Sequence, residues 1–415
     1  MVKAIAPIAS LLFGVAILLT GQGLQGVLVP VRATLEDFST LAVGFIGAFY
    51  FLGFTYGCWK GADMIRRAGH VRAFAAMTAV ASVAPLLHGL WVNLWTWGAL
   101  RLTTGFCFAV LYVVIESWLN ERANNDNRGS VFSAYIIINM TMLAAGQQML
   151  ILDDPGKLNL FAIASVLVSL AAVPVLMSRG EQPEEVTHSR IKLRDLYRNS
   201  PSGMLGSLTS GLTNGAFWAL APVFIAAVTH EIKMVAWFMT VAVLGGALGQ
   251  WPLGWWSDRV DRRYVQVWVC FAVVFMELAL WKFAPQLGES TILVLGFLWG
   301  ALAFPLYSIS VAQANDRALP GTFVMISSGL LLMYGAGAII GPVLASGIMT
   351  VLESGSLFLF AAMAHIGLGV FIIARRRKED EVATTAQTDF SNALTSALTA
   401  SQVYEEEIES DPQKQ

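Results

Sequence analysis

Charged residues are scarce in this chain. Asp, Glu, Lys and Arg make up 13% of its 415 residues, against roughly 25% in a soluble domain. Hydrophobic residues make up 56%, and the mean hydropathy is +0.63. So few charges exclude an ordinary water-exposed domain and predict an integral membrane protein surrounded by lipid. The formal net charge is −2, and we expect no nucleic-acid partner.

Cysteine is also rare. Cys58, Cys107 and Cys270 all lie inside apolar runs, and their spacing is not that of metal ligands. The chain contains no recognisable nucleophile–base pair and no phosphate-cradling loop. We therefore expect no metal, no cofactor and no enzymatic activity.

Long apolar runs are what the chain does contain. A bilayer core requires about 20 apolar residues per helix. The first run continues to about Pro30, which is longer than the apolar core of a signal peptide, so we interpret it as a membrane helix. Twelve runs predict an all-α polytopic protein with spans near 7–30, 40–61, 71–91, 94–118, 130–151, 158–177, 203–228, 234–256, 265–284, 291–312, 322–350 and 357–374.

A polar, proline-containing stretch, residues 178–202, separates six runs from six. It predicts an N-terminal half (1–177), a linker (178–202) and a C-terminal half (203–375). Residues 376–415 form a polar tail in which, from position 379 onward, nine acidic residues face one lysine. Low hydrophobicity and high charge favour disorder, so we expect this tail to be solvated.

Polar landmarks in the two halves share one offset. Asp258 and Asp63 lie 195 positions apart, and so do Arg262 and Arg67, Asp316 and Glu121, and Gly341 and Gly146. Matched landmarks at a fixed spacing indicate an internal duplication. Two parallel six-helix repeats are the architecture of one large class of transporters.

Basic residues lie mostly on one side of the predicted spans, which predicts that this side is cytoplasmic. The expected location is the bacterial inner (plasma) membrane, with both termini in the cytoplasm. The basic side holds Arg66, Arg67, Arg72, Arg122, Arg128, Arg259, Arg262, Arg263, Arg317 and the run at 375–378, whereas the other side holds Arg32, Lys157, Lys233 and Lys282.

The turn at 254–263 reads Gly-x-x-x-Asp258-Arg259-x-Asp261-Arg262-Arg263. It resembles the loop signature of the major facilitator superfamily, G-x-x-x-D-R-x-G-R-R, with Asp261 in place of the last glycine. Its first-half copy is weaker, since Trp59 and Met64 replace the glycine and the first arginine.

Two further stretches are similar to motifs of the same family. Arg101-x-x-x-Gly105 resembles its arginine motif, and Gly335-Ala-Gly337-x-x-x-Gly341-Pro342 resembles its glycine–proline motif. Glu116-Ser-Trp118-Leu-Asn120, followed by Arg128-Gly129, resembles a subgroup of bacterial facilitators of uncertain substrate. The resemblance implies a fold of two six-helix halves and secondary active transport by alternating access. We expect a monomer.

The matched charged turns predict a gate. Acids at the ends of the fourth and tenth helices can pair with turn arginines, and a turn carboxylate can cap a helix N-terminus. Single exposed pairs are worth only about 0–1 kcal/mol, but several together can bias a two-state equilibrium. The candidate gate residues are Asp63, Arg67, Glu121, Asp258, Arg259, Arg262 and Asp316, with more of the work expected in the second-half turn.

Glycines recur at four-residue spacing, which lets helices approach closely in lipid. We expect them to pack helices and to supply smooth faces on which the halves slide. The candidates are Gly53, Gly57, Gly61, Gly337 and Gly341, the last followed by Pro342, whose missing N–H weakens the helix.

Two charged residues fall inside predicted spans. Because a charge in the bilayer is costly, Arg101 is expected to face a cavity or a partner. Glu116 lies about 22 Å further along the same helix at 1.5 Å per residue, too far to pair with Arg101. It can take up a proton or pair with a loop arginine, and both interpretations remain open.

The resemblance implies a central cavity lined by helices one, four, seven and ten. The candidate substrate residues on these helices, besides Arg101, are neutral or aromatic: Gln22, Gln25, Tyr112, Asn214, Trp218, Tyr307 and Ser308. Such a lining suits an amphipathic solute, and an unpaired arginine suits an organic anion. The expected partners are thus a small molecule, protons and membrane lipid. Efflux of an amphipathic compound and transport of an organic anion both stay open, and the alternative is a non-transporting sensor or scaffold that uses the acidic tail.

Overall fold

The computed structural model describes residues 8–122, 128–177, 193–318 and 322–376, together with Gln387 and Phe390. Every regular element in these residues is a helix, and twelve helical segments are long and apolar enough to cross a membrane. This confirms the expected all-α polytopic fold. The first half comprises α2 (Ala9–Leu35), α3 (Thr40–Ala68), α4 (His70–Leu90), α5 (Leu94–Arg122), α6 (Arg128–Gln148) continued by η2 (Met149–Leu152), and α7 (Asn159–Leu170) with α8 (Ala172–Leu176).

The second half repeats the pattern. It comprises α9 (Leu193–Asn199), α10 (Pro201–Thr229), α11 (Ile232–Ser257), α12 (Arg262–Phe283) with η3 (Ala284–Gln286), α13 (Glu289–Ala303), α14 (Pro305–Asn315), α15 (Phe323–Val351) and α16 (Ser356–Arg376). The tenth span is broken between α13 and α14 at Pro305, which lacks a backbone N–H. Residues 193–199 of the expected linker form α9, and residues 178–192 lie outside the described part of the chain.

Side chains before the first turn fix several helix starts. Ser39 accepts from the Ala42 N–H at α3, Asn93 accepts from Trp95 and Thr96 at α5, and Ser200 accepts from Gly203 at α10. Each cap satisfies a donor that the helix leaves open. At the join of α3 and α4 a single residue, Gly69, turns the chain with a φ of 81°, a conformation that glycine adopts without strain.

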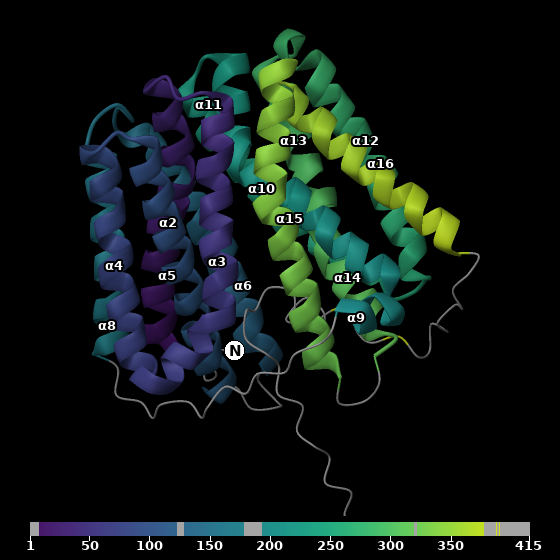
Figure 1. Ribbon diagram of the computed structural model, residues 1–415, viewed down its shortest axis with the longest axis horizontal. Coiled ribbons are helices and arrows are strands. Elements are labelled where there is room, and N and C mark those ends of the chain that lie inside the picture. The colour runs from purple at the N-terminus through teal and green to yellow at the C-terminus, as the bar shows by residue number, and fades with distance from the viewer. Residues whose placement is uncertain are drawn as a thin grey trace, which may run out of the picture.

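The two halves stand side by side in Figure 1, with α3 next to α10 and α15 at their boundary. We call the end at which α3 passes into α4, α11 passes into α12 and α16 ends the basic end. Large apolar side chains on the outer surface, such as Phe13, Trp95 and Phe275, are exposed. In an integral membrane protein this surface contacts lipid, so their exposure carries no penalty.

Close glycine contacts hold each half together. A Cβ at Gly53 of α3 would overlap the Leu102 carbonyl of α5, and a Cβ at Gly245 of α11 would overlap the Phe297 carbonyl of α13. Leu102 and Phe297 lie 195 positions apart, and the two glycines lie 192 apart. The same pair of helices therefore meets in the same way in both halves, which is the duplication seen in three dimensions.

The sequence suggested that the glycine stripes form the surface on which the two halves slide. The structure places them elsewhere. Gly57 and Gly61 pack α3 on α5, and Gly337 and Gly341 pack α15 on α10, all within one half. Contacts across the boundary involve other glycines: Gly44 faces Ser346, Gly47 faces Ala219, and Gly335 faces Thr55. Sequence spacing identified small-residue stripes but could not tell which neighbouring helix each stripe meets.

The glycine contacts predict opposite effects for two matched substitutions. Gly53→Ala should lower the thermal unfolding temperature of the purified protein, because overpacking costs about 1–3 kcal/mol. Gly367→Ala on α16, where an added Cβ meets nothing within 4 Å, should be neutral or stabilising by up to about 1 kcal/mol from helix propensity. Thermal unfolding followed by tryptophan fluorescence measures both, and equal shifts would contradict the packing role of Gly53.

Candidate functional site

A cavity with a volume of about 1680 Å³ lies between the two halves. Its walls come from α2, α3, α5 and α6 on one side and from α10, α11, α14 and α15 on the other. The implied lining helices one, four, seven and ten are thus joined by helices two, five, eight and eleven. At the basic end, Asp63, Arg66, Trp255 and Arg259 line the cavity while remaining partly exposed, so this end is its mouth.

The end opposite the mouth is held shut by contacts between the halves. Gln148, at the end of α6, donates a 2.8 Å hydrogen bond to Thr240 of α11. The Thr240 hydroxyl is itself buried against Ala144 and Gln147. Gly44 of α3 sits against Ser346 and Pro342 of α15. Contacts between the halves at one end and an exposed mouth at the other describe a cavity that is open on one side.

Arg101 lines the cavity from α5. Its guanidinium carbon lies 4.3 Å from the centre of the Tyr50 ring. Its Nε is buried without a hydrogen-bond partner, and it forms no ion pair within the described residues. The aromatic face stabilises the cation only partly, so the guanidinium keeps donors for an anionic group.

Gln22 of α2 joins two tyrosines from neighbouring helices. Its side-chain amide donates to the Tyr50 hydroxyl at 3.1 Å, and the Tyr112 hydroxyl donates to its amide oxygen at 2.9 Å. The ring of Phe54 lies 6.1 Å from that of Tyr112. This network orients Tyr50, and through it the ring on which Arg101 rests.

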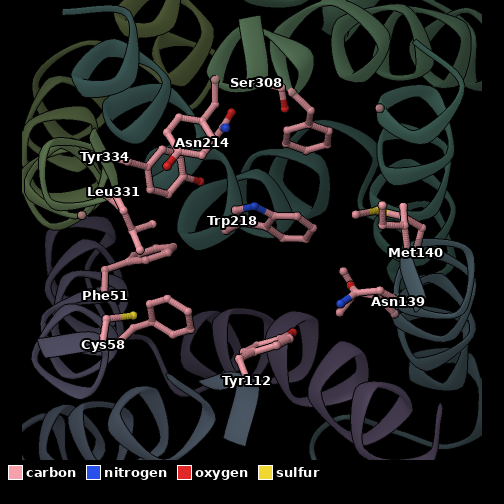
Figure 2. Close-up of a pocket in the computed structure, with 18 of the residues that line it drawn as sticks. Phe51, Cys58, Tyr112, Asn139, Met140, Asn214, Trp218, Ser308, Leu331 and Tyr334 are labelled. Carbon is pink, nitrogen blue, oxygen red and sulfur yellow. The ribbon is translucent and has the colours of Figure 1, made fainter. Parts of the chain in front are cut away.

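An aromatic wall faces this network from the second half. Trp218 of α10 stacks on Phe304 with ring centres 5.7 Å apart and planes 11° apart, and the rings of Tyr307 and Tyr334 are 4.7 Å apart. Figure 2 shows Trp218 projecting into the space between Tyr112 and Asn139 on one side and Ser308 and Asn214 on the other. Asn214 keeps a buried side-chain oxygen without a partner.

All eight candidate substrate residues lie in the cavity wall, including Gln25, Tyr307 and Ser308. Sequence reasoning missed Tyr50, Phe54, Phe304 and Tyr334. Tyr50 and Tyr334 belong to helices two and eleven, which the resemblance did not assign to the cavity. A polar aromatic next to a glycine stripe, as at Tyr334-Gly335, is the one signal that could have identified them.

Glu116 of α5 is fully buried and lines the cavity. The Tyr135 hydroxyl of α6 donates to its Oε1 at 3.4 Å. Arg101 lies near the start of α5 and Glu116 near its end. The two charges are therefore too far apart to pair, as the helical rise predicts.

The second-half turn is a buried charge network. Arg262, 1% exposed, reaches Asp316 at the end of α14 at 2.7 Å, Asp258 at the end of α11 at 3.0 Å and the Ser257 hydroxyl at 3.0 Å. The pairing between a turn arginine and the acid of the tenth helix is thus present in this half. Arg259 instead lies over the Trp255 ring.

Asp261, the departure from the family pattern, is the residue that caps α12, because its carboxylate accepts from the Arg263 N–H at 2.9 Å. The capping expected of a turn carboxylate therefore falls to Asp261, while Asp258 ends α11 and holds Arg262.

The first-half turn is different. Asp63, 37% exposed, pairs with Arg66 at 2.7 Å and reaches Lys60 at 4.0 Å, both on its own helix. The expected pairing of Arg67 with Glu121 is not formed: both side chains are exposed, and neither has an ion-pair partner within the described residues. Residues three apart on one helix are neighbours whatever the tertiary fold. Asp63 therefore pairs with Arg66 and not with a residue from another helix.

Within the described ranges, no three His, Cys, Asp or Glu side chains come together as a metal site. The nearest to such a cluster is the buried pair in which His365 Nδ1 lies 2.9 Å from Glu277 Oε1, with Trp299 donating to the same oxygen at 3.0 Å. It joins α12, α13 and α16 away from the cavity, so Glu277 is a buried acid that links helices.

Residues 203–404 match the model of the Major Facilitator Superfamily. The chain is 27% identical to an uncharacterized MFS-type transporter of Enterobacter sp. (strain 638), over 90% of this chain and 96% of that protein. It is 26% identical to one of Yersinia enterocolitica, over 91% and 97%.

Among solved structures, it resembles the nucleoside transporter NupG, with a TM-score of 0.76 at 12% identity, covering 89% of this chain and 99% of that one. It also resembles a bacterial homologue of the human lysosomal transporter Spinster in an inward-facing, occupied conformation, with a TM-score of 0.72 at 12% identity over 92% and 98%. At these identities the structures support the fold alone.

The charge network is buried in the second-half turn and exposed in the first-half turn, so breaking it should cost more stability in the second half. Asp316→Ala should lower the free energy of unfolding by about 3 kcal/mol, the lower end for breaking a buried ion pair on one side, because Asp258 and Ser257 still hold Arg262. Asp63→Ala, which breaks an exposed pair, should cost no more than about 1 kcal/mol. Thermal or denaturant unfolding of the two variants in the same detergent makes the comparison, and equal losses would argue against a turn network centred on Arg262.

Proposed function

We propose that this chain, which is similar over most of its length to MFS-type transporters, is a secondary active transporter of the major facilitator superfamily for a small amphipathic organic anion. Alternating access moves the anion through the central cavity. The observation that carries this proposal is the Arg101 guanidinium, a cation without an ion-pair partner among the described residues in an otherwise largely neutral wall. A cation inside a membrane-spanning helix is costly unless a counter-charge is supplied, and a bound anion supplies it.

The rest of the lining supports an amphipathic body for this anion. Trp218, Phe304 and Phe54 offer apolar ring faces, and Asn214, Asn139 and Ser308 offer neutral hydrogen-bonding groups around them. Binding sites for small organic molecules combine mostly apolar walls with a few placed polar groups. A sugar needs many more donors and acceptors than this wall offers.

We place the basic end in the cytoplasm of a bacterial inner membrane, following the excess of arginine at that end. The open mouth then faces the cytoplasm. The Spinster homologue in the inward-facing, occupied structure has the same orientation as the one proposed here. The matched contacts within each half let the halves rock as units, so that closing the mouth opens the far end.

Coupling to protons is assigned to Glu116, the buried acid of the cavity. Glu116 lies about 22 Å along α5 from Arg101, so we propose that its proton and the anion at Arg101 are coupled through the movement of the halves, which favours the carrier loaded with both. That coupling gives symport of the proton and the anion, and hence uptake down a proton gradient. Export of an uncharged amphipathic compound is the second candidate, supported by the aromatic wall alone.

Arg101→Gln should reduce transport of an aromatic carboxylate by about 10- to 100-fold, the value of one charge-assisted hydrogen bond of about 1.5–3 kcal/mol. Arg101→Lys should retain part of the activity, because it keeps the charge but loses the planar fork. The assay is flux into proteoliposomes with a panel of radiolabelled solutes. The control is Arg72→Gln at the exposed start of α4, which should transport normally.

If Arg101→Gln transports the carboxylates as well as the wild type, the anion assignment is wrong. If the folded wild-type protein transports no member of a broad panel, whereas its tail binds a cytoplasmic protein, the sensor or scaffold alternative is favoured.

Glu116→Gln should abolish accumulation driven by a pH gradient while leaving exchange of labelled for unlabelled solute largely intact. The amide mimics a permanently protonated carboxyl, so the carrier still moves the solute but no longer releases the proton. Parallel measurements of gradient-driven uptake and of exchange separate the two steps. Equal loss of both would assign Glu116 to folding or to solute binding instead.

A further inference from the structure

Two residues of the acidic tail rest on the second-half turn. The Phe390 N–H donates to Asp258 Oδ1 at 3.0 Å, and the Gln387 side-chain amide donates to the Val260 carbonyl at 3.3 Å. The Phe390 side chain is buried, with 5% exposed, in the same apolar cluster as Leu196, Val265 and Leu306. A polar, acidic tail therefore places one aromatic ring in the core of the second half.

The ring fills a notch made by the signature glycine. At Gly254 the three nearest atoms to an added Cβ all belong to the Phe390 ring, which the added atom would overlap. At Gly245 and Gly249 of the same helix the nearest atoms belong to the backbone of α13. The α11 surface is thus covered by a helix along most of its glycine stripe and by the tail at its basic end.

The tail also joins the buried charge network. Asp258 Oδ1, which accepts from Phe390, is the oxygen that pairs with Arg262. Phe390 lines the cavity mouth together with Gly254, Asp258 and Arg259, opposite Trp59, Asp63 and Arg66 of the first half. Closing the mouth must bring these two sets of residues together, and the Phe390 ring lies against Gly254 in one of them.

We propose that Gln387 and Phe390 form an intramolecular wedge, a tail ligand for the Gly254–Asp258 notch that holds the basic end of the cavity open and must leave before the mouth closes. A ligand favours the state to which it binds better. Here the docked tail and the open mouth occur together in one structure. Because the tail is tethered at Arg376, its local concentration stays high without any tight contact.

The notch is specific for an aromatic group that carries a free backbone N–H. The glycine provides space for a flat ring, the Asp258 carboxylate accepts the N–H, and the Val260 carbonyl accepts a side-chain amide. Gln387 and Phe390 supply these groups at a spacing of three residues. Any partner that captures this part of the tail would release the wedge and favour closure.

The first test measures docking. Amide hydrogen exchange of the peptide that contains residues 387–390 is followed in the full-length protein and in Gly254→Ala, whose new methyl displaces the ring. Exchange in this peptide should accelerate about tenfold or more, the change expected when a buried aromatic contact is lost. Unchanged exchange in Gly254→Ala would overturn the proposal, because the tail would not depend on the notch.

The second test measures the state of the mouth. Spin labels at exposed Arg67 of α3 and Trp251 of α11, in a background with the three cysteines replaced by serine, report the distance between the halves. Phe390→Ala and Gln387→Ala should move the population from the longer toward the shorter distance. Phe390→Tyr, which keeps the ring, should restore the longer one.

The matched control is Phe275→Ala, which removes a ring that is 70% exposed on α12 and should change neither readout. Faster tail exchange without any change in the distance distribution would overturn the wedge and leave only a docked tail. Neither measurement involves flux, so this inference can fail while the proposed transport function stands, and the reverse also holds.

Discussion

The close approach of helices at glycine is the constraint on which the rest of this structure depends. Lipid gives two apolar helices no reason to associate, so packing and backbone proximity must supply it. Gly53 against Leu102 and Gly245 against Phe297 bring whole backbones together at matched places in the two halves. Each half consequently behaves as one body. At the boundary between the halves, Gly44, Gly47 and Gly335 make contacts of this kind, and we expect movement to cost least there.

The cavity occupies that boundary, and its location explains why polar groups survive inside an apolar protein. Gln22, Asn214 and Arg101 face a shared space in which the halves do not pack. Facing lipid, the same groups would meet no partner, and an arginine at the bilayer centre costs about 2.5–3.5 kcal/mol even on the milder scales. The Tyr50 ring under the guanidinium and the Gln22 bridge to Tyr50 offset part of that cost. The donors of the guanidinium that face the cavity stay available for a ligand.

Twelve spans, two halves and the cavity position of the candidate substrate residues could be predicted, because apolar run length and a fixed repeat offset are properties of the sequence itself. Partners could not. The offset made Asp63 equivalent to Asp258, yet Asp63 pairs with Arg66 on its own helix, because a neighbour at i+3 is always within reach. The glycine stripes were recognised, but their periodicity gives a helix face and not the helix opposite it. Phe390 lay in a tail whose composition indicated only solvation, and a single buried ring leaves no trace in composition.

The two halves share a fold but not a distribution of charge. In the second half, Arg262 is enclosed by Asp258, Asp316 and Ser257 across α11, α12 and α14, and residues 203–404 are the ones that match the family model. In the first half, the corresponding acids lie at the surface, where an ion pair contributes little. A two-state movement needs a favoured position that can be biased by a few kcal/mol. A buried network can supply a larger bias than an exposed pair, so under the proposed alternating access the second-half turn is expected to govern the equilibrium.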